Sequence, residues 1–361
     1  MARVYNFGAG PATLPLEVLE RAREELLDYA GRGMSLLEMS HRSPEYTEVH
    51  ERTRGLVRRL LGLGDDFQVL LLGGGATLQF AMVPLNLLGP ERGCDFTITG
   101  AWSRKAHTDA ARLGRVRVVY DGRDDDYHQL PDPAALDIDP SAAYLYLTSN
   151  ETIGGLQWWQ LPDSGAVPIV CDMSSDIMSR QLPAERFGLI FAGAQKNLGP
   201  AGVTLVLIRG DVLERCRQDL PAYLSYRSHA AKGSLYNTPP VFAVYLMGLV
   251  LEWIERQGGV AAMERLAGLK SAILYGVIDT HPEFYRCPVA PPCRSRMNVV
   301  FRLPDEDLER RFMEQAQAEG LVGLKGHRSV GGLRASIYNA MPPEGVEELA
   351  RFMEEFVRRQ G

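Results

Sequence analysis

The sequence predicts an α/β fold, in which a mainly parallel, seven-stranded sheet flanked by helices is followed by a smaller α+β domain. Over most of the chain, short apolar runs alternate with segments of helical periodicity, which indicates strand–helix–strand units. Most of these runs are mainly apolar and show no regular alternation with polar residues, as is typical of parallel strands buried on both faces. Such sheets bind ligands at the carboxyl ends of their strands.

Seven runs are expected to form the strands of this sheet: 67–72, 95–99, 116–120, 142–147, 168–171, 189–191 and 203–208. Apolar residues at helical spacing predict helices over 16–27, 45–61, 78–87 and 241–251, the first stopped by Gly31 and Gly33. The last part of the chain is expected to contain helices at 261–278, 305–319 and 343–359 and strands at 297–302 and 333–336. We expect a large cofactor-binding domain over 16–258 and a small domain made of 1–15 and 259–361.

Composition excludes several classes of protein. With 45% hydrophobic and 23% charged residues the chain is typical of a folded globular protein, and its net charge of −6 argues against a nucleic-acid or anionic-membrane surface. The apolar stretch 241–251 is about half the ~20 residues that span a bilayer, and the N-terminus lacks the apolar core of a secretory signal. Five cysteines without a Cys-x-x-Cys motif indicate neither a disulfide framework nor a zinc site. We expect a cytoplasmic protein without a metal site.

Lys196 is the first candidate for chemistry. The 39 basic residues include only five lysines, and Lys196 follows the apolar run that ends at Ala194. Partial burial lowers the pKa of an amine from about 10.4 and frees it for Schiff-base formation. The alternative is a surface lysine at the end of a strand.

Polar or glycine-rich residues follow five of the predicted strands, and parallel strands bring these ends to one edge of the sheet. Each has an alternative when taken alone: Gly73–Thr77 as a tight turn without a ligand, Trp102 as core, and Asp172 as a helix N-cap. The glycine turn lacks the Lys-Ser/Thr of a P-loop and the third glycine of a dinucleotide site. The acidic segment 121–139 lacks calcium-loop spacing and is expected to be a solvated connection.

Together these residues match the needs of pyridoxal phosphate. The glycine turn and the following helix would hold its phosphate, Trp102 would stack on its ring, Asp172 would pair with its ring nitrogen, and Lys196 would bind its aldehyde. The combination is more specific than any single member.

Longer motifs then carry a family resemblance that runs from residue 5 to the C-terminus. They are Asn6–Ala12, Met39–Ser43, Gly73–Phe80, Ala194–Gly202, Tyr236–Pro240 and Gly323–Asn339. In these strings the chain resembles the phosphoserine aminotransferases, which are class-V aminotransferases of pyridoxal-phosphate fold type I.

The resemblance implies a role for each matched residue around the cofactor. Lys196 would form the Schiff base and move the substrate's proton, while Asp172 would stabilise the ring. Trp102 would stack on the ring and Thr152 would bind its phenolic oxygen. The phosphate would be bound by Ala76, Thr77 and Gln195, together with Asn237 and Thr238 of a second subunit. The active sites of a homodimer would therefore be shared.

The resemblance also implies two anion sites for the substrates. Arg334 would bind the α-carboxylate, and a distal pocket would contain His41, Arg42, His327 and Arg328. A surface ion pair is the alternative for each arginine. Some relatives have an arginine where this chain has Ala76 and Thr77, which leaves more of the phosphate recognition to the distal pocket.

The implied reaction interconverts O-phospho-L-serine and 2-oxoglutarate with 3-phosphohydroxypyruvate and L-glutamate by a ping-pong mechanism, in serine biosynthesis. The vitamin B6 precursor 4-phosphohydroxy-L-threonine is a second possible substrate. A serine or alanine:glyoxylate aminotransferase would not need the distal pocket, a cysteine desulfurase would need a nucleophilic cysteine, and a non-catalytic phosphate-binding protein would use Lys196 only structurally. Of the other lysines, Lys325 is the rival for the cofactor, whereas Lys105, Lys232 and Lys270 are expected in polar or helical-surface positions.

Overall fold

The computed structural model describes residues 3–360 and contains one large sheet. Its strand order is β2-β10-β9-β8-β5-β3-β4, and only β10 runs antiparallel to its neighbours. The seven strands are β2 (Phe67–Leu72), β3 (Cys94–Ile98), β4 (Val116–Asp121), β5 (Leu145–Thr148), β8 (Ile169–Asp172), β9 (Phe187–Gly193) and β10 (Thr204–Arg209). The predicted mainly parallel, seven-stranded sheet is confirmed.

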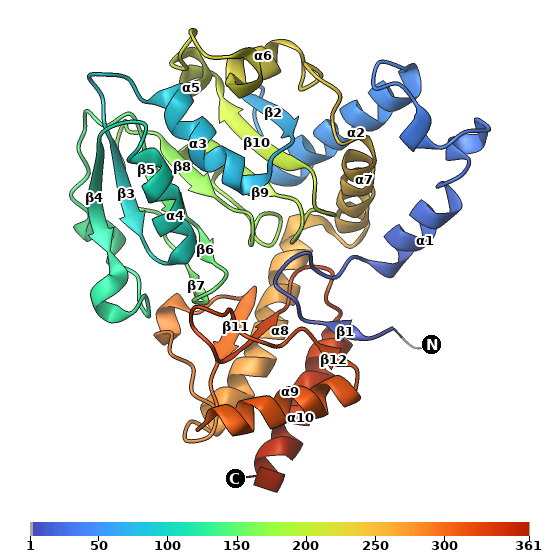
Figure 1. The fold of residues 1–361 in the computed structure, drawn as a ribbon, viewed down its shortest axis with the longest axis vertical. Coiled ribbons are helices and arrows are strands. Elements are labelled where there is room, and N and C mark those ends of the chain that lie inside the picture. The colour runs from blue at the N-terminus through green and yellow to red at the C-terminus, as the bar shows by residue number, and fades with distance from the viewer. Residues whose placement is uncertain (1–2, 361) are drawn as a thin grey trace.

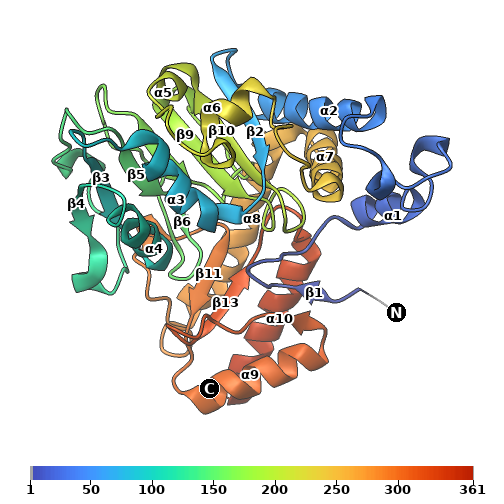
Figure 2. The ribbon, with the colours of Figure 1, turned by 45° about the horizontal axis from the view of Figure 1, so that its top comes forward.

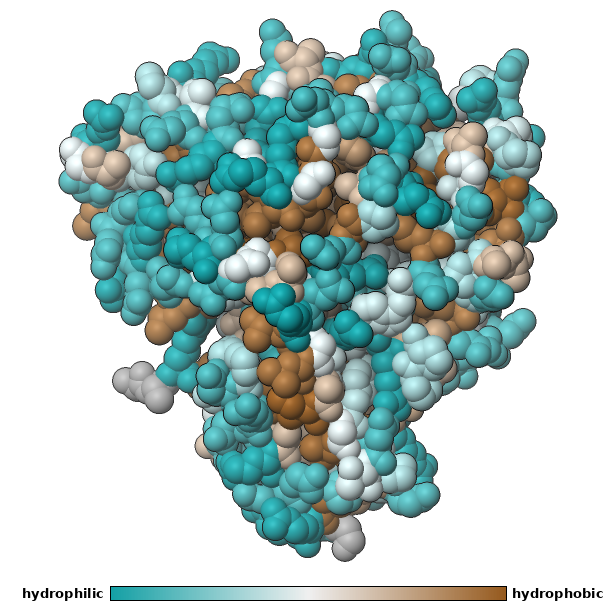
Figure 3. Space-filling model, turned by 180° about the vertical axis from the view of Figure 1, so that it is seen from behind, coloured by the Kyte–Doolittle hydropathy of each residue, from teal (hydrophilic) through white to brown (hydrophobic). Residues whose placement is uncertain are grey.

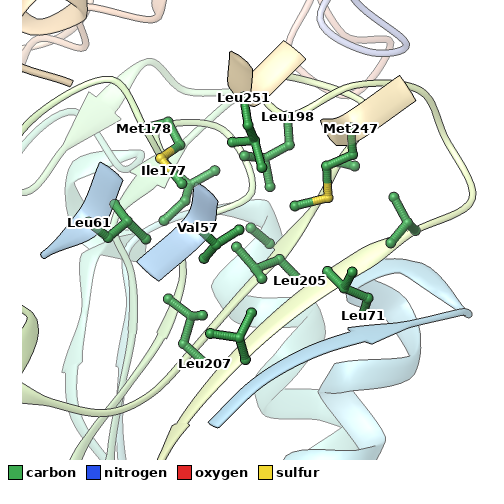
Figure 4. Packing of buried hydrophobic residues seen from close by; sticks show 14 of the residues in the cluster. Val57, Leu61, Leu71, Ile177, Met178, Leu198, Leu205, Leu207, Met247 and Leu251 are labelled. Atoms are coloured by element: carbon green, nitrogen blue, oxygen red, sulfur yellow. The ribbon is translucent and has the colours of Figure 1, made fainter. Parts of the chain in front are cut away.

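Helices cover both faces of this sheet (Figure 1). On one face α2 (Pro44–Leu61) packs beside α7 (Val241–Arg256), and on the other lie α3 (Gly75–Leu87) and α4 (Ala101–Ala110). Figure 4 shows the first of these interfaces, where Leu71, Leu205 and Leu207 of the sheet meet Val57 of α2 and Met247 of α7. This arrangement explains the mainly apolar runs, because the central strands bury side chains on both faces, whereas the edge strand β4 is partly exposed.

The strand directions decide where a site can form. Because β2, β3, β5, β8 and β9 run the same way, their carboxyl ends lie at one edge of the sheet. A short hairpin of β6 (Asn150–Glu151) and β7 (Leu156–Gln157) follows β5 at this edge. Two short helices, α5 (Gly210–Glu214) and α6 (Tyr226–Ala231), follow β10.

The C-terminal part forms a second body below the sheet (Figure 2). It contains α8 (Gly259–Thr280), β11 (Asn298–Phe301), α9 (Glu306–Ala318), β12 (Leu321–Val322), β13 (Leu333–Ser336) and α10 (Pro343–Gln360). The N-terminal strand β1 (Tyr5–Asn6) pairs with β12, and Phe7 is buried in the apolar cluster of this body. The strands β11 and β13 form an antiparallel pair.

The main differences from the sequence prediction are at element ends. Helix α1 (Leu16–Glu24) stops before residue 27, because Leu26 and Leu27 are exposed and have no core to pack against. Strand β5 begins at Leu145 and not at residue 142, because a turn closed by the bond from Ala142 N to Asp139 O precedes it. Trp102 lies in the first turn of α4.

Apolar side chains also reach the surface. In the space-filling view of the rear face they form patches between polar areas (Figure 3). Six of the exposed large apolar residues lie in the N-terminal segment 16–37, namely Leu16, Leu19, Leu26, Leu27, Met34 and Leu37. Within residues 3–360, no helix has both the length and the apolar character needed to cross a membrane.

Candidate active site

Lys196 lies in the turn that follows β9, at the sheet edge where the parallel strands end. Its Nζ atom donates a 2.6 Å hydrogen bond to Oγ1 of Thr152, which follows β6. The amine is enclosed by surrounding protein groups. The resulting loss of hydration disfavours its charged form and lowers the pKa of Lys196 to about 8. The negative charge of Asp172 opposes the shift and the positive charge of Arg334 adds to it. At neutral pH a useful fraction of this amine is therefore unprotonated.

Asp172 is the last residue of β8 and is only 5% exposed. Its Oδ1 atom accepts hydrogen bonds from Ser174 Oγ at 2.6 Å and from Ser174 N at 2.9 Å. Burial raises the pKa of this carboxyl, while the Ser174 bonds and the charge of Lys196 act against the rise. The residues after Asp172 form turns and not a helix, so it is not a helix N-cap.

Trp102 faces the same amine from the first turn of α4, the helix that follows β3. The Nζ atom of Lys196 lies 5.7 Å from the centroid of the Trp102 ring. The main chain of Trp102 is fixed by Glu151, whose Oε2 atom accepts from Trp102 N at 3.1 Å. A flat apolar ring beside a buried amine is suited to stacking against an aromatic ligand.

The glycine turn after β2 leads directly into α3. Gly74 and Gly75 have φ values of 91° and 66°, which suit glycine and allow the sharp change from strand to helix. Among the described residues no side chain caps α3, so the N–H groups of Ala76 and Thr77 remain available in its first turn. Such a helix N-terminus can bind a phosphate.

Arg334 approaches the site from β13. Its Nη1 atom donates to the backbone O of Thr152 at 3.3 Å, while its buried Nε has no partner among the described residues. Burial lowers the pKa of this guanidinium, and no carboxylate of the described chain lies within ion-pair distance. A cavity of about 550 Å³ opens beside Arg334 and is also lined by Arg104, His128 and Arg302. This basic cavity is suited to an anionic ligand.

The remaining candidates divide into two groups. His327 and Arg328 lie in the segment before β13, and the charges of Arg334 and Arg328, added to burial, lower the pKa of His327. We use the name Lys196 cluster for Lys196, Thr152, Asp172, Trp102 and Arg334. By contrast with His327 and Arg328, which lie close to Arg334 in the chain, the residues His41, Arg42, Asn237 and Thr238 make no hydrogen bond or ion pair with this cluster in the described chain. Gln195 lies next to Lys196, and its backbone O accepts from Ala12 N.

The other lysines behave differently from one another. Lys325 is exposed and its backbone bridges to Leu333, so it lies outside the cluster of Asp172 and Trp102. The expectation of a polar or surface position for Lys270 is wrong. Lys270 is 1% exposed, its Nζ donates to the carbonyls of Tyr338 and Met341, and burial lowers its pKa to about 7. The burial of Lys270 depends on the carbonyls of Tyr338 and Met341, which lie 68 and 71 positions later in the chain. Local periodicity does not reveal contacts at this separation.

Sequence reasoning did not assign roles to Glu151, Ser174 or Gly10. Glu151 and Ser174 contact Trp102 and Asp172 directly. A Cβ atom at Gly10, where φ is 138°, would lie 3.4 Å from Cγ of Lys196, so the N-terminal segment packs closely on the lysine. Gly10 lies within the motif string Asn6–Ala12, whereas Glu151 and Ser174 lie outside all of these strings, next to Thr152 and two residues after Asp172.

Comparisons with known proteins identify the family to which the chain belongs. The aminotransferase class-V family model matches residues 4–349. The chain is 51% identical to the phosphoserine aminotransferase of Chromobacterium violaceum, over 100% of both chains. Among solved structures, the phosphoserine aminotransferase of Bacillus circulans subsp. alkalophilus is similar with a TM-score of 0.98 and 48% identity, covering 99% of each chain.

A PLP-bound phosphoserine aminotransferase from Trichomonas vaginalis is also similar, with a TM-score of 0.90 and 38% identity over 98% of this chain and 100% of the other. The likeness therefore extends over the whole sheet and the C-terminal body, and it includes the strand ends that surround Lys196. The chain belongs to the class-V aminotransferases and, within them, to the phosphoserine aminotransferase family.

Proposed function

We propose that this protein is a pyridoxal-phosphate-dependent phosphoserine aminotransferase. It interconverts O-phospho-L-serine and 2-oxoglutarate with 3-phosphohydroxypyruvate and L-glutamate, a step of L-serine biosynthesis. The observation that carries the proposal is the buried amine of Lys196, with its pKa lowered to about 8, beside Asp172, Thr152, Trp102 and Arg334. Full-length identity of 51% to a phosphoserine aminotransferase supports the substrate.

The residues present fit pyridoxal phosphate. The first turn of α3 has free N–H groups for the phosphate, whereas that of α4 is already occupied by Glu151. Only Oδ1 of Asp172 accepts hydrogen bonds from described residues, so Oδ2 is available for a ring nitrogen. Trp102 offers a ring face and Lys196 offers the amine.

Pyridoxal phosphate, when bound, supplies an electron sink for the bonds at the substrate's Cα. The chain's residues do the rest. The amine of Lys196 would hold the cofactor at rest and, once the substrate has displaced it, would take the proton from the substrate's Cα and deliver it to the cofactor's C4′. The carboxylate of Asp172 stabilises positive charge on the ring nitrogen, and Thr152 orients the lysine amine through the 2.6 Å bond.

Substrate selection is assigned to two anion sites. The guanidinium of Arg334 binds the α-carboxylate shared by phosphoserine and glutamate, which its unpartnered buried Nε supports. His41, Arg42, His327 and Arg328 bind the distal group. Since this chain has Ala76 and Thr77 in the turn, recognition of the substrate phosphate depends on this distal pocket. The same pocket would accept 4-phosphohydroxy-L-threonine, a precursor in vitamin B6 biosynthesis.

We further propose a homodimer with shared active sites. Asn237 and Thr238 are exposed and contact no member of the Lys196 cluster in their own chain, which fits binding to the phosphate in a partner chain. The exposed apolar residues of segment 16–37 would be covered in such a dimer. We also propose the large domain over 16–258, the small domain of 1–15 with 259–361, and a cytoplasmic location, which suits the five free cysteines.

Transamination of 2-oxoglutarate tests the function, with O-phospho-L-serine, L-serine and L-alanine compared as amino donors. The proposal expects phosphoserine to have a kcat/KM roughly 10²-fold or more above the other two, because serine and alanine have no phosphate to pair with the cationic groups of the distal pocket. Preference for serine or alanine would favour a different aminotransferase of the same fold.

Mixing two inactive variants tests the shared sites. In a heterodimer of Lys196→Ala and Asn237→Ala/Thr238→Ala chains, one site combines both defects and the other has neither. Activity should therefore reappear after the two proteins are unfolded together and refolded. If the mixture stays as inactive as its components, the sites are not shared.

A further inference from the structure

Glu151 is a buried carboxylate whose side chain reaches from β6 to the first turn of α4. It is 1% exposed, and no basic side chain of the described residues forms an ion pair with it. Its Oε2 atom accepts from Trp102 N at 3.1 Å, and its Oε1 atom accepts from Ser103 N at 2.9 Å and from Ser103 Oγ at 2.6 Å. All of its polar neighbours are thus hydrogen-bond donors from a single helical turn.

The hydroxyl of Ser103 is committed to this arrangement. Its oxygen accepts from Thr99 N at 2.9 Å and from Gly100 N at 3.0 Å. Of the two acceptors within reach of its hydrogen, Oε1 of Glu151 at 2.6 Å is closer than Gly100 O at 3.2 Å. The carboxylate therefore organises the main chain from the end of β3 into α4. The positive end of the helix dipole stabilises its negative charge.

The packing around the carboxylate leaves no space for adjustment. A Cβ atom on Gly100 would lie 2.5 Å from Cδ of Glu151, so a larger residue at this position would displace the carboxylate from its hydrogen bonds. The main chain at Trp102 is therefore held in place on both sides, at Gly100 before it and at Ser103 after it. The same glutamate lies next in sequence to Thr152, which accepts the hydrogen bond from Lys196.

We propose that Glu151 is a positioning residue for the reaction, whose carboxylate fixes the first turn of α4 and thereby holds the Trp102 ring over the Lys196 amine. The inference rests on the proposed function, since the ring that Trp102 would cover is that of pyridoxal phosphate. Glu151 does not touch this ring itself. It acts through the main chain of Trp102, and the ring of that residue lies 5.7 Å from Nζ of Lys196.

The variant Glu151→Gln tests the proposal, because it keeps the size of the side chain but turns an amide N–H₂ toward a backbone N–H. The measurement is the dissociation constant of pyridoxal phosphate from the apo-protein, followed by quenching of tryptophan fluorescence and by visible absorption. We expect the constant to rise roughly 10-fold or more, as for loss of a charge-assisted hydrogen bond.

Asp95→Asn is the matched control. Asp95 is equally buried, accepts two 2.8 Å bonds from Arg117, and lies at the start of β3, at the other end of the strand that leads to Gly100. Asp95→Asn should lower the denaturation midpoint. It should leave cofactor affinity within about twofold of the parent, because substitutions at distant sites affect stability and binding independently. Equal loss of affinity in both variants would mean that Glu151 has only a structural role.

A double-mutant cycle separates positioning from other effects. In a Trp102→Ala background, Glu151→Gln should change cofactor affinity by much less than in the parent, because the group that it positions is gone. An undiminished effect would overturn the proposal. If Glu151→Gln does not fold, Ser103→Ala takes its place in the cycle, with the same dependence on Trp102 expected.

The two proposals fail separately. A parent protein that binds no pyridoxal phosphate overturns both the function and the role of Glu151. A parent that binds the cofactor and a Glu151→Gln variant that binds it equally well overturn the role of Glu151 alone.

Discussion

The Nζ atom of Lys196 donates a 2.6 Å hydrogen bond to the hydroxyl oxygen of Thr152, 44 positions earlier in the chain. The backbone O of the same threonine accepts from Arg334 at 3.3 Å. Thr152 thus connects the lysine after β9 with the arginine of β13, which belong to different bodies of the molecule. Thr152 therefore contacts both the lysine proposed to bind the cofactor and the arginine proposed to bind the substrate carboxylate.

Two lysines have lowered pKa values, but only one is expected to bind the cofactor. Lys196→Ala should abolish visible absorption by bound pyridoxal phosphate and reduce transamination by several orders of magnitude. Lys270→Met should keep the absorption and lose stability of about 1–3 kcal/mol, because two buried carbonyls lose their donor. Borohydride reduction followed by peptide mapping identifies the modified lysine. Labelling of Lys270 in place of Lys196 would contradict the assignment.

The pH dependence of cofactor binding follows from the Lys196 amine. Its pKa of about 8 lies below the ordinary value of 10.5, so the amine is mostly protonated below pH 8 and mostly free above it. The rate at which the apo-protein condenses with pyridoxal phosphate should rise as pH increases and level off above about 8. Stopped-flow absorbance measures it. A rate that keeps rising toward pH 10.5 would indicate an ordinary, solvated lysine.

Asp172 affects the same titration in a known direction. Its negative charge raises the pKa of Lys196, so Asp172→Asn should move the midpoint of condensation to lower pH. The variant should also lower kcat by roughly 10²–10³-fold, as for the loss of one partner of a buried ion pair. A midpoint that moves to higher pH would show that Asp172 does not act on Lys196 through its charge.

Ser174 is expected to keep Asp172 ionised. Its hydrogen bonds lower the pKa of the Asp172 carboxyl, against the effect of burial. Ser174→Ala removes the 2.6 Å hydroxyl bond, so the pKa should rise and the acidic limb of the kcat profile should move to higher pH. Activity measured between pH 5 and 8, roughly the range in which such carboxyls titrate, tests this. An unchanged acidic limb would exclude the role.

Substitutions at the two anion sites should have different patterns. Arg334→Gln should lower kcat/KM for phosphoserine and glutamate alike, by roughly 10²-fold or more, because both carry the α-carboxylate. Arg42→Ala or Arg328→Ala should reduce phosphoserine turnover more than glutamate turnover, since a phosphate carries nearly two charges and a carboxylate one. Half-reaction kinetics with each donor separate these effects. Equal losses for both donors in all three variants would contradict two distinct sites.

Much of the fold could be predicted from the sequence because its physical signals are local. The β2 and β10 runs are mainly apolar since both faces of the sheet are covered there, and each strand begins and ends within one residue of its predicted limits. The predicted end of α1 at residue 27 was wrong, because Leu26 and Leu27 continue the helical spacing but have no core to pack against. Local periodicity does not show whether an apolar side chain has something to pack against.

The site could be predicted in part for the same reason. Lys196, Asp172 and Trp102 are each found by their place after a strand, so the parallel sheet brings them together. Glu151 and Lys270 have no such local signal: their burial depends on α4 and on the backbone at Tyr338 and Met341. The distal residues His41, Arg42, Asn237 and Thr238 depend on a second chain in our proposal, which one sequence does not place in space.

The half-reaction with O-phospho-L-serine tests the central claim most directly. Purified protein loaded with pyridoxal phosphate should show the visible absorption of the lysine-bound cofactor. Addition of phosphoserine alone should convert it to the absorption of the amine form, with one 3-phosphohydroxypyruvate released per site. Lys196→Ala should show neither change. A parent protein that remains colourless with added cofactor, or whose absorption phosphoserine leaves unchanged, would contradict the account.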